Sequence, residues 1–142
     1  MAPQFDLQYK NITDKILFAF FKVVYTELGY GFLEKVYENA MLISLRSMGL
    51  LVKNQEKIDV YFQGEIVGEY YADLLVENCV IVELKAAHLI SSDHEAQLLN
   101  YLRATPYEVG LVLNFGPKPD FYRRVFSNNR KSFTWNKSMD TD

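Results

Sequence analysis

The chain has 142 residues, of which 49% are hydrophobic and 15% aromatic, enough for one compact domain with a substantial core. No segment has the 18 or more uncharged apolar residues of a membrane span, and the first residues lack the basic and apolar regions of a signal peptide. The single cysteine, Cys79, cannot form an internal disulfide. We therefore expect a cytoplasmic protein with no membrane partner.

The charge is distributed unevenly along the chain. The formal net charge is −3, which argues against a general polyanion binder. Residues 1–120 carry 10 basic and 16 acidic side chains, whereas residues 121–142 carry 5 basic and 2 acidic ones. The basic side chains of the second segment either contact phosphates or form a solvated end, and both interpretations stay open: Arg123, Arg124, Arg130 and Lys131.

Two helices are predicted first. Residues 13–28 place apolar side chains on one face, and Thr13 can cap the start. The glycines within residues 29–31 break the chain. A second helix is predicted over residues 32–48, with Gly49 as its C-terminal stop.

Short strands are predicted next. Residues 50–63 form one bent strand or two, and residues 65–77 form another. A tight turn at residues 77–78 leads into a buried strand over residues 79–86. The segment is therefore an antiparallel meander of three or four strands.

A third helix and a buried strand complete the predicted core. Ser92 opens the helix, and Glu95 stands where a capping box would place it. The helix ends near Arg103, and the strand covers residues 108–115. Because a helix separates this strand from the strand at 79–86, we expect the two to be parallel neighbours joined by a right-handed crossover.

The predicted order is α-α-β-β-β-β-α-β, a mixed α/β or α+β sandwich in which helices flank a central mixed sheet. One domain is expected over residues 1–142, with its core at about 12–116 and a basic C-terminal extension at 117–142. Within that extension, residues 121–135 add a strand or pack loosely.

Three ionisable residues interrupt the most hydrophobic part of the chain. Glu83 and Lys85 are two positions apart on one strand, so they point to the same face. A hairpin about residues 77–78 brings Asp73 opposite Glu83 or Leu84. Two adjacent carboxylates repel each other and suit Mg²⁺ or Mn²⁺, beside which a lysine can position water or offset phosphate charge. The alternative is a buried ion pair with the third group at its rim.

Four motifs occur in order along the chain: GFLEKVY at 31–37, Asp73, ELK at 83–85, and QLLNY at 97–101. Together they resemble the PD-(D/E)xK nuclease superfamily and, within it, the small GxxExxY proteins. The resemblance covers about residues 12–116 and implies a restriction-endonuclease-like core. Tyr71 and Ala72 stand where many members have a proline before the aspartate, which is a common departure.

The resemblance implies a metal site. Asp73 and Glu83 would be direct ligands of Mg²⁺ or Mn²⁺, and the backbone carbonyl of Leu84 would supply a third oxygen. Glu34 would add a ligand or bind the ion through water. The alternative for Glu34 is an acid favourably placed at a helix N-terminus.

The resemblance also implies the remaining site residues. Lys85 would be the catalytic lysine, and Gln97 and Tyr101, which share a helix face, would support it or contact substrate phosphate. Their alternative is an ordinary polar edge of an amphipathic helix. Tyr37 would bond a site carboxylate or pack in the core, and both remain open.

These features predict a metal-dependent nuclease that hydrolyses phosphodiester bonds of nucleic acid, with DNA as the expected substrate. A homodimer would supply the surface that such a small, acidic domain lacks. Two alternatives remain: a nuclease-fold module that binds nucleic acid or a protein without efficient turnover, and a structural domain whose charges satisfy one another.

Overall fold

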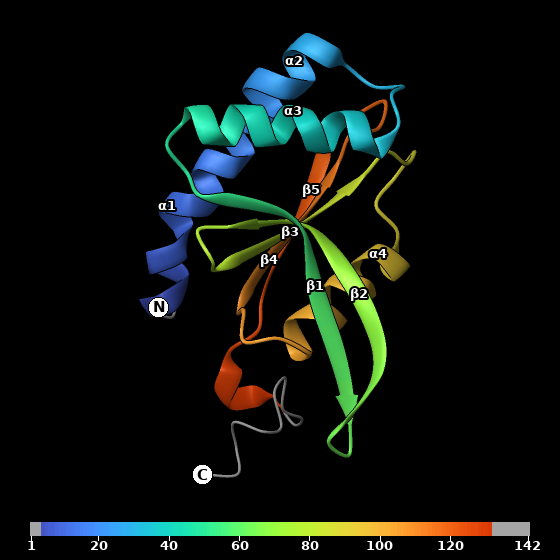
Figure 1. Ribbon diagram of the computed structural model, residues 1–142. Helices are drawn as coiled ribbons and strands as arrows, with labels where there is room; N and C mark the ends of the chain where they lie inside the picture. Colours follow the sequence, from blue (N-terminus) through green and yellow to red (C-terminus); the bar gives the residue numbers. More distant parts are fainter. Residues whose placement is uncertain (1–3, 132–142) are drawn as a thin grey trace.

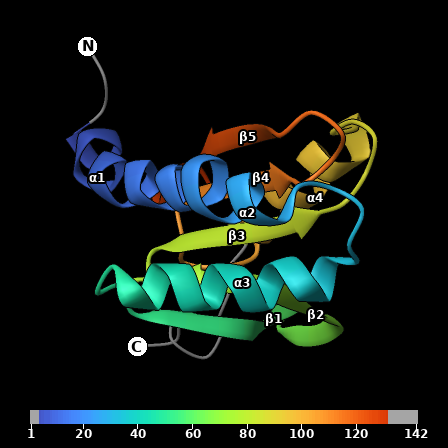
Figure 2. The ribbon, with the colours of Figure 1, turned by 90° about the horizontal axis from the view of Figure 1, so that it is seen from above.

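The computed structural model describes residues 4–131, and these form a five-stranded mixed sheet covered by helices on both faces (Figure 1). The strands follow the order β1-β2-β3-β4-β5 across the sheet. The continuous helix formed by α1 and α2 lies with α3 over one face, and α4 covers the other (Figures 1 and 2). The expected α+β sandwich is thus confirmed.

The first helix is longer than predicted. It combines α1 (Gln4–Phe18), a π-helical segment (Ala19–Val24) and α2 (Tyr25–Leu28) without interruption. Thr13 was expected to cap the start, but its hydroxyl donates to the Lys10 carbonyl from within the helix. The helix can begin earlier because no glycine or proline stands between its ends.

Helix α3 (Glu34–Ser47) follows a break at Gly29 and Gly31, both of which have positive φ angles. Gly49 also has a positive φ, at +83°, and ends the helix as predicted.

The meander contains three strands before α4, where the predicted order had four. Strand β1 (Val52–Phe62) is a single strand with a register shift between Val60 and Tyr61, so the bend does not divide it. It pairs antiparallel with β2 (Glu65–Val76), which pairs antiparallel with β3 (Val80–Lys85). Glu77 and Asn78 form the tight turn, both with φ of 54°.

Helix α4 (Ser92–Arg103) connects β3 to β4 (Val109–Asn114), and these two strands are parallel, as predicted. Its cap differs from the prediction. Ser91 closes a capping box with His94, because the neighbouring serines offer two registers and the chain uses the earlier one.

Strand β5 (Asp120–Val125) pairs antiparallel with β4, so the sheet extends beyond residue 116. The segment predicted to add a strand or pack loosely therefore adds one within residues 121–125, and its part beyond 131 lies outside the described residues. Lys131 is turned inward, and its ammonium group donates to the carbonyls of Thr105 and Tyr107.

Each face of the sheet has its own core. Successive residues of β3 contribute to the two cores in turn. Val80, Val82 and Leu84 pack under α1 and α3, whereas Ile81 packs under α4. Glu83 and Lys85 follow the alternation of Ile81 and therefore point toward α4. No helix within residues 4–131 has the length and apolar character needed to cross a bilayer.

Candidate active site

Strands β2 and β3 separate at Asp73 and Glu83, and we call this point the fork. Their last ladder pair is Leu74 with Val82. Beyond it, the Asp73 amide donates to Glu83 Oε2 at 2.9 Å, and the Leu84 amide donates to Asp73 Oδ2 at 2.8 Å. Two carboxylates therefore take the place of the backbone carbonyls that would accept from these amides in a continued ladder. The sequence predicted that the hairpin would bring Asp73 close to Glu83 or Leu84, and the structure places it beside both.

The fork coincides with an irregularity in both strands of the β1–β2 hairpin. Ala72 and Leu75 both pack under α4 although they are three residues apart, so β2 departs from regular alternation at Asp73. Gln55, in the facing segment of β1, has a φ of 52°. Its side-chain amide donates to Glu38 Oε1 at 2.7 Å and lies 3.5 Å from Asp73 Oδ1, which links helix α3 to the fork.

The two fork carboxylates resist ionisation. Burial raises the pKa of Glu83 to about 8, and the neighbouring charge of Asp73 adds to this effect. Burial also raises the pKa of Asp73, opposed by the hydrogen bond from the Leu84 amide. Glu83 is 4% exposed, so little water is available to stabilise its charge. A positive charge placed between the two groups would favour ionisation of both.

Lys85 and Gln97 meet beside the fork. The lysine Nζ donates to Gln97 Oε1 at 3.2 Å, which joins the end of β3 to α4. Tyr101, one turn further along α4, is buried, and its ring lies 5.8 Å from that of Tyr70 on β2. Burial, with smaller contributions from the charges of Glu83 and Asp73, raises the Tyr101 pKa to about 12, so its hydroxyl stays protonated.

The acids of α3 occupy two different environments. Glu34 is exposed in the first turn, and its charge raises the pKa of both Asp73 and Glu83. Glu38 is 4% exposed and accepts hydrogen bonds from Lys35, Asn54 and Gln55. Burial alone would raise the Glu38 pKa, but these bonds together lower it below its usual value. Sequence reasoning singled out Glu34 alone, although Glu38 lies one turn away on the same face.

Tyr37 packs in the core. Its hydroxyl donates to the Gly29 carbonyl at 2.8 Å and accepts from the Phe32 amide at 3.2 Å, and its ring stacks on Phe115. The side chain has no exposed surface, so it cannot contact substrate. Packing in the core was one of the two predictions left open for Tyr37, and its hydroxyl also fixes the loop before α3.

Asn114 is a support residue that no sequence signal indicated. Its side-chain oxygen accepts from the Ala87 amide at 2.9 Å, and its nitrogen donates to the Ala87 carbonyl at 3.0 Å. Gly116 permits this approach, because a Cβ atom there would lie 2.3 Å from the Ala87 oxygen. The chain that leaves Lys85 is therefore held against β4.

The donor set of the fork fits a hard divalent cation. The two short hydrogen bonds at the fork use Asp73 Oδ2 and Glu83 Oε2. Asp73 Oδ1 has a longer contact of 3.5 Å with the Gln55 side-chain amide, and Glu83 Oε1 takes part in neither short bond. The Lys85 carbonyl accepts from the Phe115 amide, which follows β4, so the carbonyl of Leu84, one residue earlier, points to the opposite edge, toward the fork. Within residues 4–131, no three His, Cys, Asp or Glu side chains stand together as a complete ligand set. Water would complete the coordination, as is usual for Mg²⁺.

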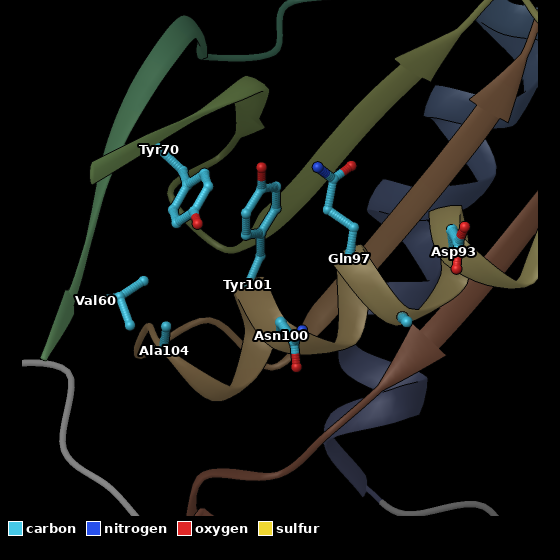
Figure 3. Close-up of a pocket in the computed structure, with 8 residues that line it drawn as sticks. Val60, Tyr70, Asp93, Gln97, Asn100, Tyr101 and Ala104 are labelled. Carbon is cyan, nitrogen blue, oxygen red and sulfur yellow. The ribbon is translucent and has the colours of Figure 1, made fainter. Parts of the chain in front are cut away.

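A groove of about 440 Å³ runs along α4 from Gln97 toward Ala104 (Figure 3). Tyr70 and Val60 form its opposite wall. In Figure 3 the side chains of Gln97 and Tyr101 project to the same side of α4, and the Tyr70 ring stands beside that of Tyr101. The groove therefore opens directly beside the partner of Lys85.

The structure therefore places two acids and a lysine where the mixed sheet forks. A family model described as PD-(D/E)XK nuclease superfamily matches residues 10–125. The chain belongs to this superfamily, which supports a nuclease function and whose members generally use divalent metal ions.

The crystal structure of SSO0001 is similar to this chain, with a TM-score of 0.53 and 14% sequence identity. The match covers 85% of this chain and 62% of SSO0001, so the chain spans less than two thirds of that protein. At this identity the likeness shows the fold alone. A search of curated proteins gave no significant match.

Proposed function

We propose that the protein is a metal-dependent nuclease that hydrolyses phosphodiester bonds, with DNA as its substrate, and that it is a GxxExxY member of its superfamily. The observation that carries the proposal is the fork, where the buried carboxylate of Glu83 and the partly buried carboxylate of Asp73, both with raised pKa values, lie beside a lysine. Burying such charges is costly, and a bound cation would offset that cost. The GFLEKVY motif supports the subfamily assignment, because its tyrosine fixes the loop that precedes its glutamate.

Asp73, Glu83 and the Leu84 carbonyl would hold Mg²⁺ or Mn²⁺, with Glu34 or Glu38 reached through water. The cation would supply Lewis-acid activation of water and would neutralise charge on the phosphate. Lys85 would position the attacking water and stabilise the developing negative charge. Gln97 would hold the Lys85 ammonium in place, and Tyr101 would support Gln97 from the next turn of α4.

Cleavage assays with single- and double-stranded DNA and RNA test this proposal. We expect Lys85→Ala to reduce cleavage by about 10²–10³-fold, as when one transition-state donor is removed. Lys57→Ala is the matched control, because that lysine is half exposed on β1 and pairs with Glu69. Equal activity of Lys85→Ala and wild type would contradict the proposal.

A second candidate is a binding module of the same fold without efficient turnover. The excess of acidic over basic side chains in residues 1–120 favours it, because a nuclease that grips a duplex usually presents basic surface. Binding of oligonucleotides without metal-dependent cleavage would support this candidate. We also propose a homodimer and a cytoplasmic location; light scattering of the purified protein tests the first.

A further inference from the structure

The groove between β2 and α4 adjoins the proposed catalytic lysine. Gln97 lines the groove (Figure 3). The same side chain accepts the hydrogen bond from Lys85 Nζ at 3.2 Å. A group bound in the groove would therefore lie next to the phosphate on which Lys85 acts. This inference rests on the proposed nuclease function.

The groove presents an aromatic surface that its neighbours hold in place. Tyr70 is 48% exposed, and its ring lies 5.8 Å from the buried ring of Tyr101 at an interplanar angle of 48°. The Tyr70 ring also covers Gly68, where an added Cβ atom would lie 3.2 Å from Cε2. Two neighbours therefore position Tyr70, and its remaining surface is available to a planar ligand.

The chemistry of the lining favours a nucleobase over a phosphate. The charged side chain among the lining residues is Asp93, an acid, and no lysine or arginine is among them. Asn100 and Gln97 contribute carboxamides, which pair with the polar edges of bases. A volume of about 440 Å³ lies within the usual range of small-ligand sites.

We propose that this groove is a nucleobase-binding subsite for the nucleotide next to the scissile phosphate. The base stacks on Tyr70, and Asn100 contacts its polar edge. A base that stacks on a protein ring has left its own helix, so the substrate has an unpaired strand at the site of cleavage.

This assignment accounts for nucleic-acid binding by an acidic domain. Residues 1–120 carry six more acidic than basic side chains, which disfavours extended contacts with a duplex backbone. Stacking on an aromatic ring depends little on charge, and it accepts any base. A short unpaired segment can therefore be held where a duplex would be repelled.

The test measures binding separately from cleavage. Fluorescence anisotropy with unpaired DNA and RNA oligonucleotides, and with blunt duplexes of the same sequence, is performed on Lys85→Ala without divalent metal so that cleavage is suppressed. Tyr70→Ala is then added, and Tyr71→Ala serves as the matched control. Tyr71 is 52% exposed, is the next residue of β2 and points to the other face of the strand.

We expect Tyr70→Ala to raise the Kd for unpaired strands by about 5- to 150-fold, the effect of losing one base–aromatic stack. Tyr70→Phe keeps the ring and restores most of the binding, and Gly68→Ala, which displaces the ring, weakens binding to an intermediate extent. Tyr71→Ala leaves the Kd unchanged. Comparison of the DNA and RNA strands identifies the sugar that the subsite accepts.

Three results would overturn the subsite: tighter binding of duplex than of unpaired strands, equal effects of Tyr70→Ala and Tyr71→Ala, or no binding of any strand. None of these depends on catalysis. Tyr70-dependent binding by a protein that cleaves nothing would instead reject the proposed nuclease and retain the subsite.

Discussion

The two halves of strand β3 face β2 in different ways. Over Val80–Val82, the strand pairs with Leu74–Val76, and every residue of both segments is a buried hydrophobic. Over Glu83–Lys85, the ladder has stopped, and carboxylates of Asp73 and Glu83 accept the peptide amides instead. The first half is a closed sheet, and the second is the fork.

The difference explains how charges are accommodated inside a hydrophobic strand. A peptide amide that loses its ladder partner needs another acceptor, and an unsatisfied buried amide costs about 1–3 kcal/mol. Asp73 and Glu83 meet that need for the amides of Leu84 and Asp73. The two acids thus provide hydrogen-bond acceptors for the backbone amides at the fork. Burial still disfavours their charged forms, as the raised pKa values indicate.

The largest expected effect on stability is where β2 and the first half of β3 form a closed sheet. Leu75 is 1% exposed in the core under α4, so Leu75→Ala should lower the free energy of unfolding by about 2–5 kcal/mol. Glu83→Gln, at the fork, keeps the shape and an acceptor oxygen, so it should cost far less while abolishing cleavage. Urea denaturation of both variants checks this, and an equal loss of stability would erase the distinction between the halves.

The next effect is a pH dependence that belongs to the fork. The Glu83 pKa is about 8 when folded and has its ordinary value of 4.5 when unfolded, so the folded state binds more protons between these values. Stability without metal should therefore fall as pH rises from about 5 to 8, with Tm decreasing by on the order of 5–10 °C. Thermal melts of Glu83→Gln should lack this decrease. A parallel decrease in the variant would assign it to other groups.

A smaller effect is expected from divalent metal. Mg²⁺ or Mn²⁺ in hundredfold excess over its Kd should stabilise the wild type by about 2.7 kcal/mol. The stabilisation should be larger at pH 8 than at pH 5, because the cation competes with the proton on Glu83. Asp73→Asn should lose this stabilisation, whereas Asp120→Asn, at the exposed first position of β5, should retain it. Thermal melts of the two variants with and without metal measure this stabilisation. Equal stabilisation of Asp73→Asn and Asp120→Asn would exclude the fork as the metal site.

The smallest effect separates the two acids of α3. Glu38→Gln replaces a buried carboxylate that accepts three hydrogen bonds, and we expect a loss of about 1–2 kcal/mol. Glu34→Gln changes an exposed side chain and should cost less than about 0.5 kcal/mol. If cleavage depends on Glu34 and stability on Glu38, the exposed acid serves the site and the buried one links α3 to the fork.

Much of the fold could be predicted because strong local patterns specify it. The crossover from β3 to β4 follows from a helix between two apolar strands, and the turn at Glu77–Asn78 sets the hairpin that brings Asp73 to Glu83. The start of the first helix was missed because Thr13 resembles a cap, although no glycine or proline interrupts the residues before it. Residues 50–63 were left as one bent strand or two, and the predicted order counted two, because a bend does not reveal whether hydrogen bonding continues through it.

The site could be predicted only as far as short-range spacing reaches. Glu83 and Lys85 are two residues apart, and Asp73 lies across one tight turn. Gln55 and Asn114 were not found, because their contacts depend on a positive φ in β1 and on the register of β4. Such features follow from tertiary packing and have no local sequence signal.

The contact between Asn114 and Ala87 extends the hydrogen bonding of strand β4 beyond its last residue. A carboxamide carries the same donor and acceptor as a peptide group, so the Asn114 side chain behaves as one additional peptide unit set beside the strand. The backbone of Asn114 already pairs with Lys85. Asn114 therefore binds the chain in two ways: its backbone pairs with Lys85, and its side chain bonds the backbone of Ala87. The ladder beside β4 in effect continues two residues past Lys85.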